Sequence, residues 1–256
     1  MFIRIVACSA IFTFAPILAV AQVTNFESYG NFQQMMKSGN SEGKINLSSL
    51  PKSSGYWGVG ALAGLRGEII QVDGALLVSH GSNTEGAVTQ PSSKDQAVLW
   101  AGAKVNQWKP MPVPEDMSQS EFETFVMNEA GRQSLNLNQP LVFRVTGQYA
   151  HLIWHVITGE ASSHSAPAPK DNAKAMPHGH HGGGHANKQT GMHVFRNPTA
   201  SGQLVVIYSG DQLEGVVSHP GERFHAHYID DALRLSGHVD QYSVRKGSTL
   251  WMPVSK

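Results

Sequence analysis

Apolar positions along the chain follow two different periods, which predict two kinds of element. Stripes at i, i+3 and i+4 predict helices over residues 31–38 and 118–130, and Ser118 with Glu121 forms a capping-box pattern at the start of the second. Short apolar runs between turn residues predict strands. The expected strands are residues 69–79 with a hairpin at Asp73-Gly74, 97–105, 141–145, 149–157, 203–208, 215–218, 224–229 and 237–244.

Glycines separate many of these strands, and Gly147 and Gly210 are expected to mark further tight turns. Many short strands joined by glycine turns, together with only two helices, are typical of a sheet protein with neighbouring strands in opposite directions. The pattern therefore predicts an α+β fold that is mainly antiparallel and barrel-like.

The first residues predict export from the cytoplasm. Arg4 precedes an apolar run over residues 5–20, and the run ends in Ala19-Val20-Ala21. A basic start, a short apolar segment and small residues at the end indicate a signal peptide, residues 1–21, which would make the mature protein periplasmic or secreted. The alternative, a membrane anchor, is disfavoured because Pro16 interrupts a run already near the minimum length for a span. No later segment predicts a membrane span.

Charge and cysteine content narrow the partners and the metal ligands. The chain has 19 basic and 19 acidic residues without a basic stripe, which argues against nucleic acid as a partner. Its single cysteine, Cys8, lies in the predicted signal peptide. Any metal in the mature chain must therefore be held by His, Asp or Glu.

A segment with almost no large apolar side chain covers residues 161–190. It cannot bury enough surface to order itself and is expected to be a mobile loop. Its histidines favour weak metal binding over a plain solvated linker. They are His164, His178, His180, His181 and His185.

Three other histidines predict a metal site. His225 and His227 are two apart in an expected strand, so their side chains point to one face. Residues 230–232 can turn the chain, which would place His238 on the neighbouring strand with Cβ atoms about 4.5–5.5 Å away. Three imidazoles can bind a cation at about 2.0–2.1 Å and leave positions open, as in catalytic sites. Imidazole suits zinc first, with other divalent transition metals as alternatives.

Around these histidines the sequence resembles the acetolactate decarboxylases. That family has a Pro-Gly segment with His-x-His and then Gly-Gly-His-Val, and this chain has PGERFHAH at 220–227 and SGHV at 236–239. A second segment, GVGALAGLRGEII at 58–70, is similar to the family's G-x-G-x-x-x-x-L-x-G-E-L-I. The resemblance covers most of residues 31–244 apart from the His-rich segment.

The resemblance implies two sheet-based subdomains, expected at residues 22–160 and 191–256, with the metal site in the second. It implies that zinc is held by the three histidines and that Glu68 is a further ligand or the catalytic acid. The family's substrate-orienting arginine would fall at about His155, which becomes the second candidate catalytic residue. No residue beyond His238 matches the family's late glutamate.

The implied activity is that of a carboxy-lyase, which converts a 2-hydroxy-3-keto acid, acetolactate, into acetoin and CO₂. The expected partner is this small molecule, and a homodimer is left open. One alternative is an exported metal-binding or metal-delivery protein on a decarboxylase-like scaffold, which the His-rich segment favours. Another is a cupin-like β-barrel, suggested by His225, His227 and Asp231 with the later segment 247–253.

Overall fold

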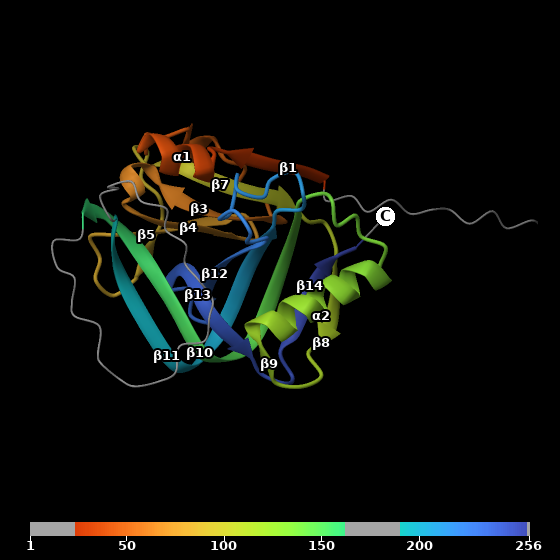
Figure 1. Cartoon of the computed structure of the whole chain (residues 1–256). Coiled ribbons are helices and arrows are strands. Elements are labelled where there is room, and N and C mark those ends of the chain that lie inside the picture. The colour runs from red at the N-terminus through yellow and green to blue at the C-terminus, as the bar shows by residue number, and fades with distance from the viewer. Residues whose placement is uncertain (1–23, 162–189, 255–256) are drawn as a thin grey trace, which may run out of the picture.

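A computed structural model of the chain describes residues 24–161 and 190–254, which form two antiparallel sheets and two α-helices (Figure 1). The first sheet contains β1 (Thr24–Tyr29), β2 (Ile45–Asn46), β3 (Tyr56–Leu62), β4 (Gly67–Val72), β5 (Ala75–His80), β6 (Val88–Thr89) and β7 (Gln96–Lys104). The second contains β8 (Trp108–Pro112), β9 (Met117–Ser118), β10 (Leu141–Ala161), β11 (Thr190–Tyr208), β12 (Phe224–Asp230), β13 (Ser236–Val244) and β14 (Thr249–Pro253). The expected α+β class with mainly antiparallel sheet is confirmed.

The first sheet has the order β1-β7-β3-β4-β5-β6, with β2 beside β7. The predicted hairpin joins β4 to β5, and Asp73 and Gly74 both have positive φ angles, as a tight two-residue turn requires. Gly60, in the G-x-G segment on β3, lies against β7: a Cβ atom there would be 2.1 Å from the Leu99 carbonyl oxygen. Close packing of two strands therefore explains this glycine of the motif.

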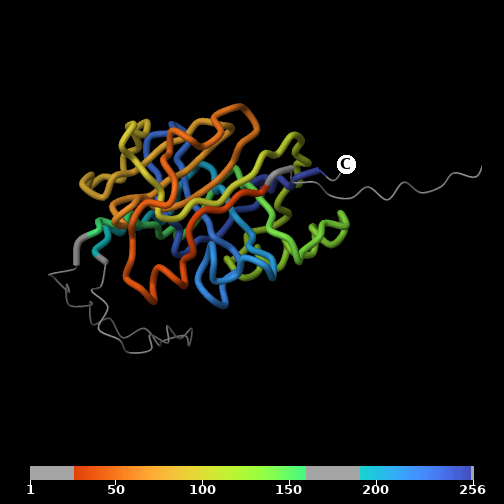
Figure 2. The backbone as a smooth tube through the Cα atoms, turned by 90° about the horizontal axis from the view of Figure 1, so that it is seen from above, coloured from red at the N-terminus to blue at the C-terminus, as the bar shows by residue number. Residues whose placement is uncertain are grey.

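The second sheet has the order β8-β14-β10-β11-β12-β13-β9. β13 also pairs with β10, so the four strands β10 to β13 form a closed ring. This closure brings β12 and β13, which carry the three candidate histidines, close to the middle of β10. Figures 1 and 2 both show the start of β1 and the end of β14 on the same side of the molecule.

Both helices lie where the apolar stripes predict them. α1 (Phe32–Ser38) begins after Asn31, whose side chain accepts a hydrogen bond from the Gln34 amide. α2 (Gln119–Arg132) begins after Ser118, whose backbone N–H and hydroxyl both donate to the Glu121 carboxylate. In Figure 1, α1 covers the first sheet and α2 lies beside the second.

The main apolar cores lie on the two faces of the second sheet. One is shared between the sheets and includes Trp57 and Ile70 of the first sheet with Val205 and Ile229 of the second. The other lies on the opposite face, where Phe122 and other residues of α2 pack. Burying the β12 face between the sheets places the histidines of that face at the junction of both halves.

Three expectations about the strands are wrong. Residues 141–145 and 149–157 belong to one strand, β10, which runs straight through Gly147 instead of turning there. A Cβ at Gly147 would be 2.4 Å from the Ser248 hydroxyl oxygen, so this glycine allows close packing rather than a turn. Residues 215–218 are not a strand, because the amides of Val216 and Val217 donate to the Leu213 carbonyl and form a turn.

Several expectations fall on other parts of the chain. The predicted signal peptide, residues 1–21, lies outside the described residues. So does the His-rich segment, apart from Ala161 and Thr190 at its ends.

The change from the first sheet to the second falls between Lys104 and Trp108, whereas the expected division at 160–161 lies where β10 and β11 pair. The subdomain boundaries stay a prediction. Within the described residues, neither helix has the length and apolar character to cross a bilayer.

Candidate metal centre

Strand geometry brings the three predicted histidines together. His225 and His227 lie two apart on β12, and their side chains share a face because successive residues of a strand alternate. His238 on β13 is the direct register partner of His227. One ring nitrogen from each of the three lies within 4.8 Å of the other two, so the predicted convergence is present.

The spacing of these nitrogens fits a small divalent cation. His225 Nε2 lies 3.1 Å from His227 Nε2 and 3.3 Å from His238 Nδ1. Two nitrogens of a tetrahedral zinc site, each about 2.05 Å from the ion, are about 3.3 Å apart. These two distances therefore match those between two ligands of a tetrahedral ion. The role of these residues as metal ligands stays a proposal.

Hydrogen bonding and burial give the histidines the form that binds metals. His225 Nδ1–H donates to the Val217 carbonyl, which leaves the lone pair of Nε2 directed at the other two rings. Burial lowers the pKa of His225 to about 4, and it lowers the pKa values of His227 and His238 well below their ordinary value. At neutral pH the three rings are therefore uncharged.

Glu68 reaches the same place from the other sheet. It lies on β4, and its Oε2 is 3.7 Å from His227 Nε2, while its Oε1 accepts a 3.4 Å hydrogen bond from the Ile157 amide. Burial raises the pKa of Glu68 to about 7, and the charge of His155 only partly opposes this. The structure thus brings Glu68 to the histidine cluster despite the long sequence separation.

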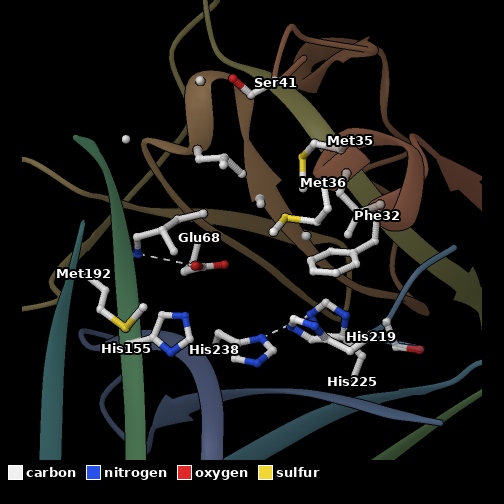
Figure 3. Close-up of a pocket in the computed structure, with 18 of the residues that line it drawn as sticks. Phe32, Met35, Met36, Ser41, Glu68, His155, Met192, His219, His225 and His238 are labelled. Carbon is white, nitrogen blue, oxygen red and sulfur yellow. Dashed lines mark hydrogen bonds between the residues drawn. The ribbon is translucent and has the colours of Figure 1, made fainter. Parts of the chain in front are cut away.

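His155 lies on β10 as the register partner of His238, and Figure 3 shows it beside Glu68 and His238 in one cavity. Its Nδ1 is 2.9 Å from both carboxylate oxygens of Asp240. Burial lowers the pKa of His155, but the hydrogen bond to Asp240 and the charges of Glu68 and Asp240 outweigh burial and raise it overall. The sequence patterns did not identify Asp240 as a site residue. It lies two residues after His238 on β13, so strand alternation places its side chain on the same face and could have identified it.

The alternation of side chains along β10 is interrupted at His151. A regular strand would have Tyr149, His151 and His155 on one face, but Tyr149 packs in the same core as Leu152 and Trp154. The reason is an irregularity at His151, whose φ angle is +51°, which shifts the alternation by one residue. His151 is exposed, and His155 faces the cavity on the other side from Tyr149.

The fold and the site define the class of this protein. It is an α+β protein with two antiparallel sheets, and a cluster of histidines with a buried carboxyl at their junction forms a candidate metal centre. The family described as alpha-acetolactate decarboxylase matches residues 28–169, and the chain belongs to this family. The matched residues include Glu68 and His155. The three histidines lie beyond the matched residues, so the family match does not test them.

Solved structures of similar fold agree with this family. Alpha-acetolactate decarboxylase from Bacillus subtilis strain 168 is 16% identical with a TM-score of 0.64, over 89% of this chain and 84% of that chain. Acetolactate decarboxylase from Bacillus subtilis subspecies spizizenii has a TM-score of 0.65 at 16% identity, over 89% and 85% of the two chains. A protein of unknown function from Staphylococcus aureus, described as similar to alpha-acetolactate decarboxylase, has a TM-score of 0.61 at 16% identity, over 89% and 84%. No curated protein matches the chain.

These structural likenesses show the fold, and the family match shows the family. The cupin-like alternative is therefore wrong. Membership of this family supports a decarboxylase-like activity.

Proposed function

We propose that the protein is a metal-dependent carboxy-lyase that converts acetolactate into acetoin and CO₂. The observation that carries the proposal is the position of Glu68, 3.7 Å from His227 Nε2 and in one cavity with His155. A buried carboxyl next to three neutral imidazoles provides both a possible metal ligand set and an acid within one site. A site built only to hold a metal has no need of the His155–Asp240 pair beside it.

In this reaction, the bond between the carboxylate and the hydroxyl-bearing carbon breaks, and CO₂ leaves without its bonding electrons. A divalent ion held by the three histidines would supply Lewis-acid chemistry that stabilises the negative charge left behind. One proton must then be added to give acetoin. The remaining tasks of the protein are to orient the substrate and to deliver this proton.

Glu68 is suited to deliver the proton. In the metal-free site burial raises the pKa of this carboxyl to about 7. A general acid is most effective when its pKa lies near the working pH. Its Oε1 is held by the Ile157 amide, while Oε2 faces the histidine cluster. The carboxyl is therefore fixed and directed at the place where the substrate would react.

His155 is suited to orient the substrate carboxylate. In the protonated ring, Nδ1–H donates to Asp240 and Nε2–H is left as a donor for the substrate. One N–H is a weaker anchor than the two-pronged guanidinium of an arginine. We therefore expect slower turnover of acetolactate than an arginine at this position would support.

The direct test is to load the purified protein with zinc and to measure acetoin and CO₂ from acetolactate. We expect the two products in equal amounts and a rate that depends on the metal. Zinc-loaded protein that forms no acetoin would contradict the proposal and favour the metal-binding alternative.

Asp240→Asn is expected to lower kcat for acetolactate by about 10-fold or more, because an amide no longer holds the Nδ1–H of His155 as a charged acceptor does. Asp240→Glu retains the charge and should recover part of the loss. The measurement is the pair of values kcat and KM for the three proteins, with circular dichroism as a folding control. An unchanged kcat in Asp240→Asn would show that this carboxylate has no role in positioning His155.

A further inference from the structure

The cavity at the metal centre has two chemically different sides. Its volume is about 870 Å³, near the upper end of the range of about 300–1,000 Å³ found for small-molecule sites. Glu68 and the histidines form one side. Figure 3 shows Phe32, Met35 and Met36 of α1 on the opposite side, across the open space from His155 and His238.

Packing contacts and a hydrogen bond hold the apolar side, or apolar wall, of the cavity in place. Met35 is buried against Leu99 of β7, and the Phe32 ring lies 4.2 Å from the His219 ring. The backbone amide of Phe32 donates a 2.8 Å hydrogen bond to the Val216 carbonyl, which fixes the start of the helix against the segment before β12. These contacts hold α1 over the histidines, so its apolar side chains face the space in which a substrate would lie.

Met36 continues this wall toward the solvent. Its side chain lines the cavity and is still 43% exposed. Met192 of β11 lines the cavity as well and is 47% exposed. Methionine is unbranched and flexible, so it adapts its shape to apolar groups of different size. Two partly exposed methionines at one cavity leave apolar surface in contact with water, and a ligand that covers them gains free energy.

Acetolactate has little apolar surface of its own. It carries only methyl groups beside its hydroxyl, keto and carboxylate groups, and it would occupy a small part of the space next to Glu68 and the histidines. We propose that the preferred substrate is a 2-hydroxy-3-keto acid with an apolar substituent larger than methyl, which lies against Phe32 and Met36. This inference rests on the proposed function for the polar end of the substrate, and the apolar wall supplies the rest.

A binding series separates this inference from catalysis. The probes are 2-alkyl-2-hydroxy acids with side chains from methyl to hexyl, which have no keto group and cannot undergo the reaction. Calorimetry with the zinc-loaded full-length chain should show that Kd falls about three- to fourfold for each added methylene until the wall is covered. A Kd that is independent of chain length, or no binding of any member, would overturn the inference.

Two variants of α1 test where the apolar substituent binds. Met36→Ser removes apolar surface from the cavity wall and should weaken the hexyl acid several-fold more than the methyl acid. Gln34→Ala changes an exposed residue of α1 that does not line this cavity, so the dependence on chain length should stay as in the parent protein. An equal dependence on chain length in Met36→Ser would show that the apolar group lies elsewhere and would overturn the assignment.

Turnover distinguishes this inference from the proposed function. The corresponding keto acids, in which the methyl group on the hydroxyl-bearing carbon of acetolactate is lengthened step by step, should show kcat/KM rising with chain length. If the protein decarboxylates acetolactate but kcat/KM does not rise with chain length, the inference about the substituent is contradicted while the proposed function stands. Binding that tightens with chain length but is followed by no decarboxylation would leave the apolar site supported and contradict the proposed reaction.

Discussion

The His227→Ala variant is expected to lose tight zinc binding, with a fall in affinity of more than about 100-fold. Changes to residues that merely orient a metal ligand already cost about 10- to 100-fold, so the loss of a ligand should cost more. His227 is completely buried, and its Nε2 lies 3.1 Å from His225 Nε2 and 3.7 Å from Glu68 Oε2. Without it, two imidazoles remain, which is too few for a tight site of this kind.

The measurement is zinc content by mass spectrometry, together with competition against a chelator of known affinity. His151→Asn is a matched control, because His151 is also on a strand of the second sheet but is exposed and outside the cavity. Weak binding by the histidines of residues 161–190 is expected to persist in both variants. Tight binding that survives the joint change of His225, His227 and His238 to alanine would refute the metal centre.

Glu68→Gln is expected to abolish decarboxylation and to stabilise the metal-free protein at alkaline pH. The loss of a positioned acid should reduce kcat by about 100-fold or more, since amide cannot donate a proton in the same way. The pKa of Glu68 rises from 4.5 in the unfolded chain to about 7 in the folded protein. Ionising this buried carboxyl therefore opposes folding, and the difference of about 2.5 pKa units corresponds to about 3 kcal/mol.

The direction of the Glu68 pKa shift determines the pH range in which the variant is more stable than the parent protein. Below pH 4.5 the carboxyl of Glu68 is protonated in both states and has no such cost. As the pH rises from 4.5 to about 7, the folded protein holds its proton longer than the unfolded chain, so the parent protein loses stability relative to Glu68→Gln. Above pH 7 the advantage of the variant stays constant.

Urea unfolding of the metal-free proteins at pH 4 and pH 8.5 measures this difference. Glu85→Gln provides a control, because Glu85 is exposed and should show no comparable gain. Equal stability of Glu68→Gln and the parent protein at pH 8.5 would mean that the buried carboxyl carries no ionisation cost. Full activity of Glu68→Gln would refute its role as the acid.

Local patterns in the sequence were sufficient for the elements and for part of the site. The two helices follow from apolar stripes and capping residues, and the hairpin follows from Asp73-Gly74. His225 and His227 share a face because alternation within a strand depends on backbone geometry alone. The motif at residues 58–70 indicates the family by its residues alone, and the family match confirms it. Each of these features is encoded by neighbours in the chain.

Local patterns failed where the backbone departs from its regular period. His151, with its positive φ angle, shifts the alternation of β10, so Tyr149 and His155 face opposite sides. Gly147 resembles a turn residue in the sequence, but its lack of a side chain serves the packing of β10 against Ser248. A glycine needed for close approach and a glycine needed for a turn are identical in sequence, and only the neighbouring strands distinguish them.

The family resemblance implied Glu68 and His155 for the site, but only the tertiary structure decided which contacts they make there. The sequence determined an antiparallel α+β chain with three histidines on adjacent strands, because turn and strand geometry act over a few residues. The approach of Glu68 to His227, the pairing of His155 with Asp240 and the placement of α1 over the cavity depend on how the sheets close and pack. Those contacts join residues far apart in the chain. Their distances depend on the side chains buried between the sheets, and the local pattern of apolar residues does not predict them.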